Sequence, residues 1–300
     1  MQERKNSLYL TEEEALKLLK NEIGHGTDGR VLPYNKKELL KVYHEYLKKQ
    51  KQKNDQISDE VKIYHKKDLK FDKESKDAMY FYADEGNGNY IRLDKVEALT
   101  KAIARQPEIV LSKLPQRLLY IDGKVSGCTL SYQKGIPIHQ FMGAPLFLKK
   151  KVLLKTLEAV KELIDHNIYP IDLDNSPYST KSIYVNEKGI MEKVGHSHVL
   201  VSLVPFEIHL IDLDGKSTIY TNFHSDKFAM DSYASFTRLM KEFLIHLDLD
   251  EELTEEELET YYQNLGISEE TLYKLTTEQM NYQDLKEFIK NYSENKRRTR

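Results

Sequence analysis

Hydrophobic and polar positions near the start of the chain predict one helix followed by two strands. Residues 11–19 place apolar side chains at helical spacing, and Thr11 with Glu14 three positions later forms a capping box. Short apolar runs at 30–32 and 38–43 enclose a polar stretch that contains proline, which is typical of two strands joined by a turn. We therefore expect a helix and then a hairpin.

The middle of the chain predicts a second helix and a second hairpin. In residues 94–104 the apolar positions recur every third or fourth residue, as on one face of an amphipathic helix. Two apolar strands, at 117–121 and 125–132, flank an Asp-Gly dipeptide, which is typical of tight hairpin turns.

The second half of the chain is predicted to contain long helices with strands between them. Apolar positions recur at helical spacing in 150–164 and 231–246, and further short helices are expected within 253–290. Two strands are predicted between the long helices, one at 182–185 and one within 207–215 that ends in Asp-Leu-Asp-Gly. No apolar run approaches the roughly 18 residues that cross a bilayer as a helix.

Composition narrows the class of protein. The 300 residues are 40% hydrophobic and 31% charged, which is ordinary for a globular chain, and the net charge of −3 gives no overall attraction to nucleic acid or membrane. The single cysteine, Cys128, excludes a disulfide framework and is interpreted as a small buried residue. Since the N-terminus also lacks the apolar core of a secretory signal, we expect a cytoplasmic location.

Two polar features are interpreted without a functional role. Residues 47–76 are rich in lysine, but acidic residues lie among the lysines, which favours a solvated insertion over a nucleic-acid patch. His196 and His198 alternate as two metal ligands on a strand would, yet no third ligand is apparent, so a surface pair is preferred.

Candidate chemistry begins with Gly-x-Gly-x-x-Gly at 24–29 and Lys41 on the second predicted strand. In a dinucleotide-binding fold such glycines would follow a strand and open a helix, whereas here they follow a helix and lead into a hairpin. Glycine lets the backbone approach phosphates closely, and its amides can donate to phosphate oxygens. The alternative is a glycine-rich turn beside a surface lysine.

Two acidic segments follow in chain order. Asp172 lies in Ile-Asp-Leu after the first long helix, and Asp212 lies in Asp-Leu-Asp-Gly at the end of an apolar strand. Either aspartate alone is typical of a turn, but both together with the glycines and Lys41 rarely coincide by chance. The chain thus resembles the protein-kinase-like superfamily over residues 8–246, in a divergent, bacterial-looking form close to atypical and small-molecule kinases.

This resemblance implies an α+β, two-lobed protein-kinase-like fold. The implied N-lobe is an antiparallel sheet at 1–132 with a polar insertion at 47–90, and the implied C-lobe is mainly helical at 133–300 with a helical C-terminal extension. The cofactors that the resemblance implies are ATP and Mg²⁺, bound between the lobes.

The resemblance also implies roles for individual residues. Lys41 would contact the phosphates, Asp172 would be the catalytic base and Glu97 would pair with Lys41. A solvated Glu97 beside Lys101 remains an alternative, with Glu45 as a substitute partner for the lysine. Leu130 and Tyr132 would bind the adenine edge through their backbone. The full implied nucleotide-binding set is Gly24, Gly26, Gly29, Val31, Lys41, Leu130 and Tyr132.

The implied metal ligands depart from the kinase pattern. Asp212 would hold Mg²⁺, for which a carboxylate is a suitable hard ligand. Pro177 occupies the usual position of the second ligand and cannot bind a metal. Asn175 is the preferred substitute, with Asp174 and Ser182 as alternatives, and Asp214 could also join the metal set. The dipeptide before Asp172 is Pro-Ile rather than His-Arg, so control through a phosphorylated activation loop is not expected.

The implied function is ATP- and Mg²⁺-dependent transfer of the γ-phosphoryl group to a hydroxyl on a protein or a small molecule. Two alternatives remain open: a pseudokinase that binds nucleotide or a partner without turnover, and a nucleotidyl (AMP) transferase on the same fold. The expected partners are a nucleotide and an unidentified hydroxyl-bearing substrate or protein. No membrane partner is expected, and nucleic acid is disfavoured.

Overall fold

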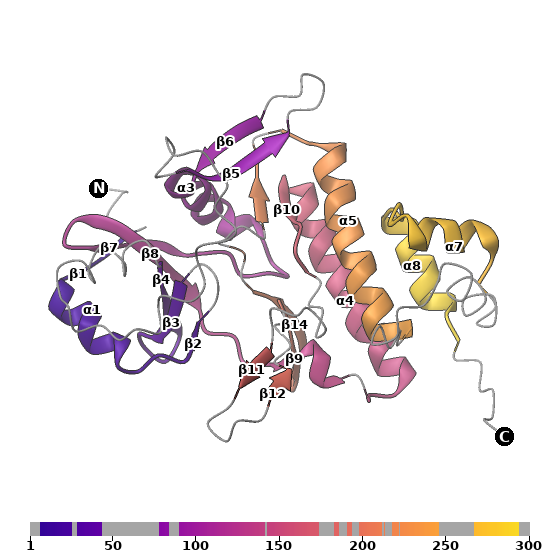
Figure 1. Cartoon of the computed structure of the whole chain (residues 1–300), viewed down its shortest axis with the longest axis horizontal. Helices are drawn as coiled ribbons and strands as arrows, with labels where there is room; N and C mark the ends of the chain where they lie inside the picture. The colour runs from indigo at the N-terminus through magenta and orange to yellow at the C-terminus, as the bar shows by residue number, and fades with distance from the viewer. Residues whose placement is uncertain are drawn as a thin grey trace. The chain divides into compact units, whose positions relative to one another are not determined.

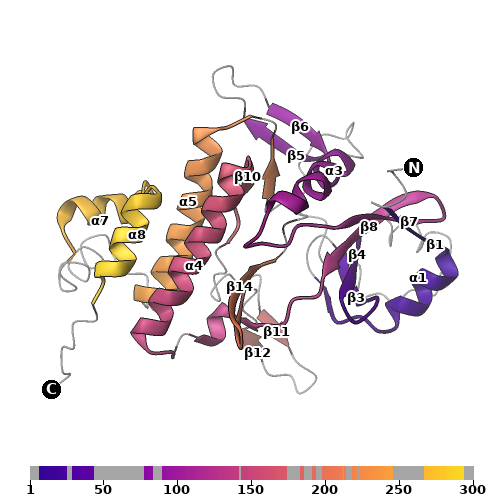
Figure 2. The ribbon, with the colours of Figure 1, turned by 180° about the vertical axis from the view of Figure 1, so that it is seen from behind.

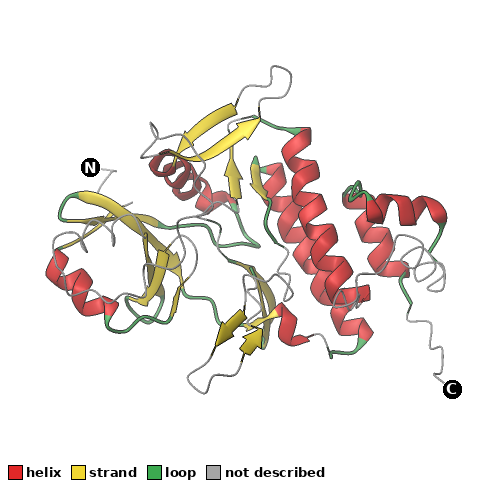
Figure 3. Cartoon of the chain, viewed as in Figure 1, coloured by secondary structure: helices red, strands yellow, loops and turns green. Residues whose placement is uncertain are grey.

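The structure is a computed structural model with both helices and strands, which confirms the α+β class (Figure 3). The chain divides into two compact units, one of Met1–Tyr132 with Leu213–Lys216 and one of Gln133–Asp212 with Ser217–Arg300. The two-lobed kinase arrangement stays a prediction. The described residues are 7–25, 29–43, 78–83, 90–141, 143–173, 183–185, 191–193, 198–211, 213, 218–221, 223–245 and 267–293.

The first unit is built on a six-stranded sheet with the order β1-β7-β8-β4-β3-β2 (Figure 1). Each neighbouring pair is antiparallel except β1 and β7, which run parallel. The strands are β1 (Ser7–Leu10), β2 (Gly24–His25), β3 (Gly29–Pro33), β4 (Glu38–Tyr43), β7 (Arg117–Ile121) and β8 (Lys124–Ser131). Both predicted hairpins are therefore confirmed.

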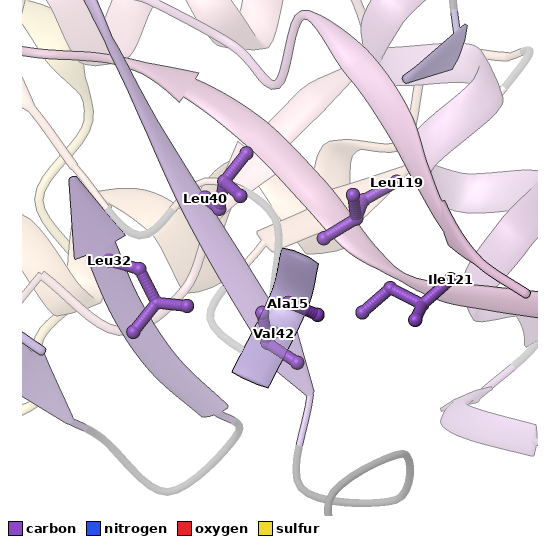
Figure 4. Close-up of a cluster of buried hydrophobic side chains, with 6 residues drawn as sticks. All are labelled: Ala15, Leu32, Leu40, Val42, Leu119 and Ile121. Atoms are coloured by element: carbon purple, nitrogen blue, oxygen red, sulfur yellow. The ribbon is translucent and has the colours of Figure 1, made fainter. Parts of the chain in front are cut away.

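One face of this sheet packs against α1 (Glu12–Leu19). Because side chains alternate along a strand, Leu40 and Val42 of β4 point to this face. They form a core with Ala15 of α1 and with further strand residues, which Figure 4 shows. The six buried residues of this cluster are Ala15, Leu32, Leu40, Val42, Leu119 and Ile121.

The opposite face packs against α3 (Lys95–Arg105), which follows the hairpin of β5 (Ala78–Ala83) and β6 (Tyr90–Asp94) and leads into the short helix η3 (Gln106–Glu108). Leu99 and Ile103 of α3 form a core with three sheet residues, Tyr43, Leu118 and Cys128. Cys128 is fully buried, as the sequence predicted. Lys41 lies on this same face, because it is two positions from Tyr43 on one strand.

A tight turn joins β7 to β8 and also anchors α1. Asp122 and Gly123 have φ values of 48° and 75°, the left-handed conformation that two-residue hairpin turns require at both central positions. The Asp122 carboxylate accepts a bond from the Glu12 amide at 3.2 Å, and its own amide donates to the Leu10 carbonyl at 3.1 Å. The predicted Asp-Gly turn therefore holds both the hairpin and the start of the helix.

The second unit is centred on two long helices, α4 (Leu146–Asp165) and α5 (Asp226–Met240), which lie side by side in both views (Figures 1 and 2). A π-helical turn, η6 (Lys241–Ile245), continues α5. Helices α7 (Glu269–Thr276) and α8 (Tyr282–Asn291) follow, and α8 contacts α4.

Short strands and one 3₁₀-helix complete the second unit. Two of the strand pairs are β10 (Ile168–Pro170) with β15 (Thr218–Tyr220) and β11 (Ile183–Val185) with β12 (Met191–Lys193). Strand β13 (Val199–Leu203) pairs with both β14 (Phe206–Leu210) and β9 (Ile136–Pro137). The 3₁₀-helix η4 (Ile138–Phe141) follows β9.

The two long helices begin earlier than the sequence predicted. Helix α4 starts at Leu146 instead of residue 150, directly after Pro145. Helix α5 starts at Asp226, where the side chain of Ser225 caps the amide of Phe228 at 3.3 Å, so the predicted start at Asp231 was wrong. The missed signal was the serine cap, which precedes the first apolar positions of the helix by three residues.

Candidate functional site

The predicted nucleotide-binding residues of the first unit lie in one row across the sheet. Gly24 of β2 pairs with Val31 of β3, Val31 pairs with Lys41 of β4, and Lys41 pairs with Cys128 of β8. Directly opposite residues of antiparallel strands point to the same face, with Cβ atoms about 4.5–5.5 Å apart where both have them. The structure therefore brings Gly24, Val31 and Lys41 together.

Lys41 is buried at the middle of this row, with 5% of its surface exposed. Among the described lysines only Lys149 shares this degree of burial, which is rare because a charged group loses hydration when it leaves water. The opposite end of the row, at Cys128 and Leu118, is covered by Leu99 of α3. A buried ammonium beside the glycine hairpin is a suitable partner for an anion such as phosphate.

A second row on the same face supplies apolar surface. Pro33 pairs with Leu39, and Leu39 pairs with Leu130, two positions along the strands from the Lys41 row. All three side chains are half-buried. They form a partly exposed apolar strip next to Lys41, which suits a flat aromatic ring such as a purine. The sequence predicted Leu130 but missed Pro33 and Leu39, which the period of two along each strand could have indicated.

The glycine segment forms the end of the hairpin of β2 and β3. Gly24 and Gly29 lie in these two strands, and the Ile23 amide donates to the Val31 carbonyl at 2.9 Å. Arg30 is directed to the other face and contacts Glu22 at 3.0 Å. Gly26 lies outside the described residues. Helix α1 precedes this hairpin and β4 follows it, which is the order that distinguished the segment from a dinucleotide-binding motif.

Gly127 makes the close approach of β8 to Lys41 possible. A Cβ at this position would lie 1.9 Å from the carbonyl oxygen of Lys41 and 3.2 Å from the Cα of Val42. No side chain fits at these distances, so only glycine allows the two strands to pack here. The sequence gives no sign of this requirement, because the contact joins distant parts of the chain.

The backbone at Tyr132 is already bonded within the protein. Its amide donates to the carbonyl of Lys37 at 2.8 Å, and Leu130 is paired with Leu39 in the ladder. The Tyr132 amide is thus already bonded to Lys37, and the backbone contact of this segment with adenine stays a prediction. Leu130 remains part of the candidate site because its side chain belongs to the apolar strip with Pro33 and Leu39.

Glu97 belongs to α3, whose residues Leu99 and Ile103 are 1% and 7% exposed and pack on the sheet. The side chain of Glu97 lies outside the described part of the structure. Its pair with Lys41 and the solvated alternative beside Lys101 both stay predictions.

In the second unit, Asp172 follows β10 and is itself exposed. The next amide, that of Leu173, donates to the Oγ of Ser235 at 2.6 Å, and both Leu173 and Ser235 are buried. The carbonyl of Asp172 is in hydrogen-bond contact with the ring Nδ1 of His198. The backbone at Asp172 is therefore held by residues from two other parts of the unit.

His198 also contacts the segment that leads to Asp212. The amide of Ile211, the residue before Asp212, donates to the His198 carbonyl at 2.8 Å. One residue thus joins the two segments in which the sequence predicted catalytic and metal-binding aspartates. Sequence reasoning treated His198 as a surface residue and missed this role, since nothing local distinguishes it.

The predicted metal ligands Asp212, Asn175 and Asp214 lie outside the described residues, as does His196. Within the part of the chain that the structure describes, no three histidine, cysteine, aspartate or glutamate side chains gather as a metal site would require. In the same described part, no helix is both long and apolar enough to span a bilayer.

The comparisons with known proteins found similarity at the level of solved structures. No protein-family model and no curated protein matches the chain. The solved structure of the Cydia pomonella granulovirus kinase PK-1 is similar to it at a TM-score of 0.39 and 10% sequence identity, over 69% of this chain and 91% of that chain. We base the function proposed below on the residues of this chain.

Proposed function

We propose that this chain is a phosphotransferase that binds ATP on the Lys41 face of the first unit and transfers its γ-phosphoryl group to a hydroxyl. The observation that carries this proposal is the buried Lys41, which shares one row of the sheet with Gly24 and Val31. A buried cation next to a glycine hairpin is suited to a polyphosphate.

The chemistry of the first unit fits a nucleoside triphosphate. The ammonium of Lys41 would neutralise charge on the α- and β-phosphates, and the backbone at Gly24 and Gly29 allows close approach. The half-buried strip of Pro33, Leu39 and Leu130 would contact the purine. Each of these residues lies on the same face of one sheet, which is why we assign them to one ligand.

Asp172 is proposed as the group that orients the acceptor hydroxyl and takes its proton. The hydroxyl oxygen forms a bond to the γ-phosphorus, the bond to the β–γ bridging oxygen breaks, and ADP leaves with that oxygen. Asp212, with Asn175 and Asp214, offers the carboxylate and amide oxygens that Mg²⁺ prefers. When bound, the metal supplies positive charge to the phosphates.

A second candidate is a chain that binds nucleotide without transferring phosphate. Pro177 favours it, because a proline at the usual position of the second metal ligand cannot bind a metal. Both candidates require nucleotide binding at Lys41 and differ only in turnover.

A thermal-shift titration with ATP, with and without Mg²⁺, tests the nucleotide site. A ligand that binds only the folded state stabilises it by about 2.7 kcal/mol at a hundredfold excess over Kd. We expect a Mg²⁺-dependent rise in Tm that is lost in Lys41→Met and in Asp212→Ala. The exposed Lys36→Met serves as a matched control and should respond like wild type. No rise with wild type would contradict both candidates.

Two positions of a radioactive label separate the possible reactions. With γ-labelled ATP, phosphotransfer places the label on an acceptor or on released phosphate, at a rate that Asp172→Asn should lower by at least about a hundredfold. Label from the α-position on an acceptor would instead indicate AMP transfer. A thermal shift with neither transfer would identify the second candidate.

A further inference from the structure

His198 lies just before β13, where it contacts both acidic segments of the second unit. Its ring Nδ1 contacts the Asp172 carbonyl, and its own carbonyl accepts the Ile211 amide at 2.8 Å. The side chain of His198 therefore contacts the Asp172 segment, and its backbone contacts the segment that ends at Ile211. A substitution of His198 changes only the first of these two contacts.

The chemistry of the first contact fixes which ring nitrogen carries the proton. A backbone carbonyl can only accept a hydrogen bond, so Nδ1 of His198 must be the donor. This holds for the neutral Nδ1–H form of the ring and for the charged form alike. The interaction therefore needs a donor at the Nδ1 position and does not need a charge.

The Asp172 carbonyl and the Leu173 amide belong to one planar peptide unit. Ser235 accepts from the amide side at 2.6 Å, and His198 donates to the carbonyl side. With both polar atoms held, the peptide plane cannot rotate without breaking a hydrogen bond. The position of the Asp172 Cα and the direction of its Cα–C bond are fixed as a consequence, which restricts where the carboxylate can lie although the residue itself is exposed.

We propose that His198 is a positioning residue for Asp172, acting through the donor at Nδ1. This inference rests on the proposed function, in which the Asp172 carboxylate must meet the acceptor hydroxyl. A general base acts only within hydrogen-bond reach of the proton it takes, so its placement affects the chemical step rather than nucleotide binding. His198 touches neither the nucleotide nor the hydroxyl in this scheme.

Three substitutions of His198 separate positioning from a general structural role. His198→Asn keeps an N–H donor near the place of Nδ1, whereas His198→Gln moves the donor to the place of Nε2 and His198→Leu removes it. All three retain the backbone carbonyl that accepts the Ile211 amide. The matched control is His166→Leu, which removes a similar bond of 2.8 Å from a ring Nδ1 to the carbonyl of Glu162.

Steady-state release of γ-phosphate from ATP is the first readout. The Leu and Gln variants should lose about tenfold or more in kcat with KM for ATP unchanged, since about 1.4 kcal/mol corresponds to tenfold in rate. The Asn variant should recover most of the loss, and His166→Leu should retain wild-type kcat. Equal rates in all variants, or an equal loss in Leu, Gln and Asn, would overturn the proposal.

Hydrogen exchange at the Leu173 amide is the second readout, and it does not depend on turnover. Exchange at this amide should be about tenfold faster in His198→Leu and His198→Gln than in wild type, and close to wild type in His198→Asn. Unchanged exchange in the Leu variant would overturn the positioning role even if the enzyme is active. Absence of nucleotide turnover in wild type, with these exchange differences present, would contradict the proposed function alone.

Discussion

At the scale of single residues, the Lys41 row depends on a long side chain at Lys41 and on the absence of a side chain at Gly127. Lys41 brings a long charged side chain into a buried part of the sheet, and Gly127 on the neighbouring strand brings none. The carbonyl of Lys41 occupies the place where a side chain at 127 would begin. The position of the lysine backbone therefore depends on the absence of a Cβ one strand away.

Gly127→Ala should destabilise the first unit by about 2–3 kcal/mol, because the new methyl group must push β8 away from β4. The change should also weaken ATP binding, since it displaces the backbone of Lys41. Urea unfolding and the ATP thermal shift measure the two effects. Gly143→Ala, where nothing lies within 4 Å of the added Cβ, is the control and should be nearly neutral. Equal stability of the two variants would contradict the assigned role of Gly127.

Only some of these residues could be predicted from the sequence. Lys41 and Val31 belong to short local patterns, a strand and a glycine segment, and they could be assigned to one site before any contact was known. Gly127 and His198 act through contacts with distant segments, which leave no local trace.

At the scale of elements, the sequence predicted correctly those features that depend on a few neighbouring residues. The capping box of Thr11 and Glu14 and the Asp122–Gly123 turn are complete within a few residues, and both were confirmed. The start of α5 was wrong because apolar periodicity marks the buried middle of a helix better than its first turn. Ser225 sets that start through its own side chain.

The cap of α1 should make stability depend on pH. The Thr11 amide donates to the Glu14 carboxylate at 2.8 Å and the Thr11 hydroxyl at 3.0 Å, and these bonds hold the pKa of Glu14 below its usual range. A lowered carboxyl pKa in the folded state adds stability above the unfolded pKa, and that stability is lost as the pH falls through the folded value. Wild type should therefore be more stable than Glu14→Gln at pH 7, and the difference should shrink as the pH falls below the ordinary carboxyl value of 4.5 and through the lowered folded pKa of Glu14. A difference in thermal unfolding that stays constant throughout the acid range would contradict this account.

At the scale of the whole molecule, the chain has two compact units with separate roles in the proposal. The first holds the nucleotide-binding face, and the second holds Asp172 with its supporting residues. Hydrogen exchange should therefore slow in the first unit when ATP and Mg²⁺ are added. We expect this protection in residues 29–43 and 124–132 and no change in α7 and α8. Protection confined to the second unit would refute the assignment of the nucleotide to the Lys41 face.

The parallel pairing of β1 with β7 has a consequence for how the protein behaves in concentrated solution. Without β1, the outer amides and carbonyls of β7 would be open to a strand from another copy, and exposed edges of this kind promote association. The Leu10 carbonyl accepts from the Asp122 amide, so the backbone polar groups of Leu10 face β7. Leu10→Pro therefore removes an amide from this pairing, whereas Leu10→Ala only shortens the side chain. On size-exclusion chromatography at increasing concentration, the proline variant should form oligomers and the alanine variant should elute like wild type. If both variants elute like wild type, β1 is not needed to prevent association. If only the proline variant forms oligomers, the four-residue strand β1 prevents copies of the protein from associating through β7.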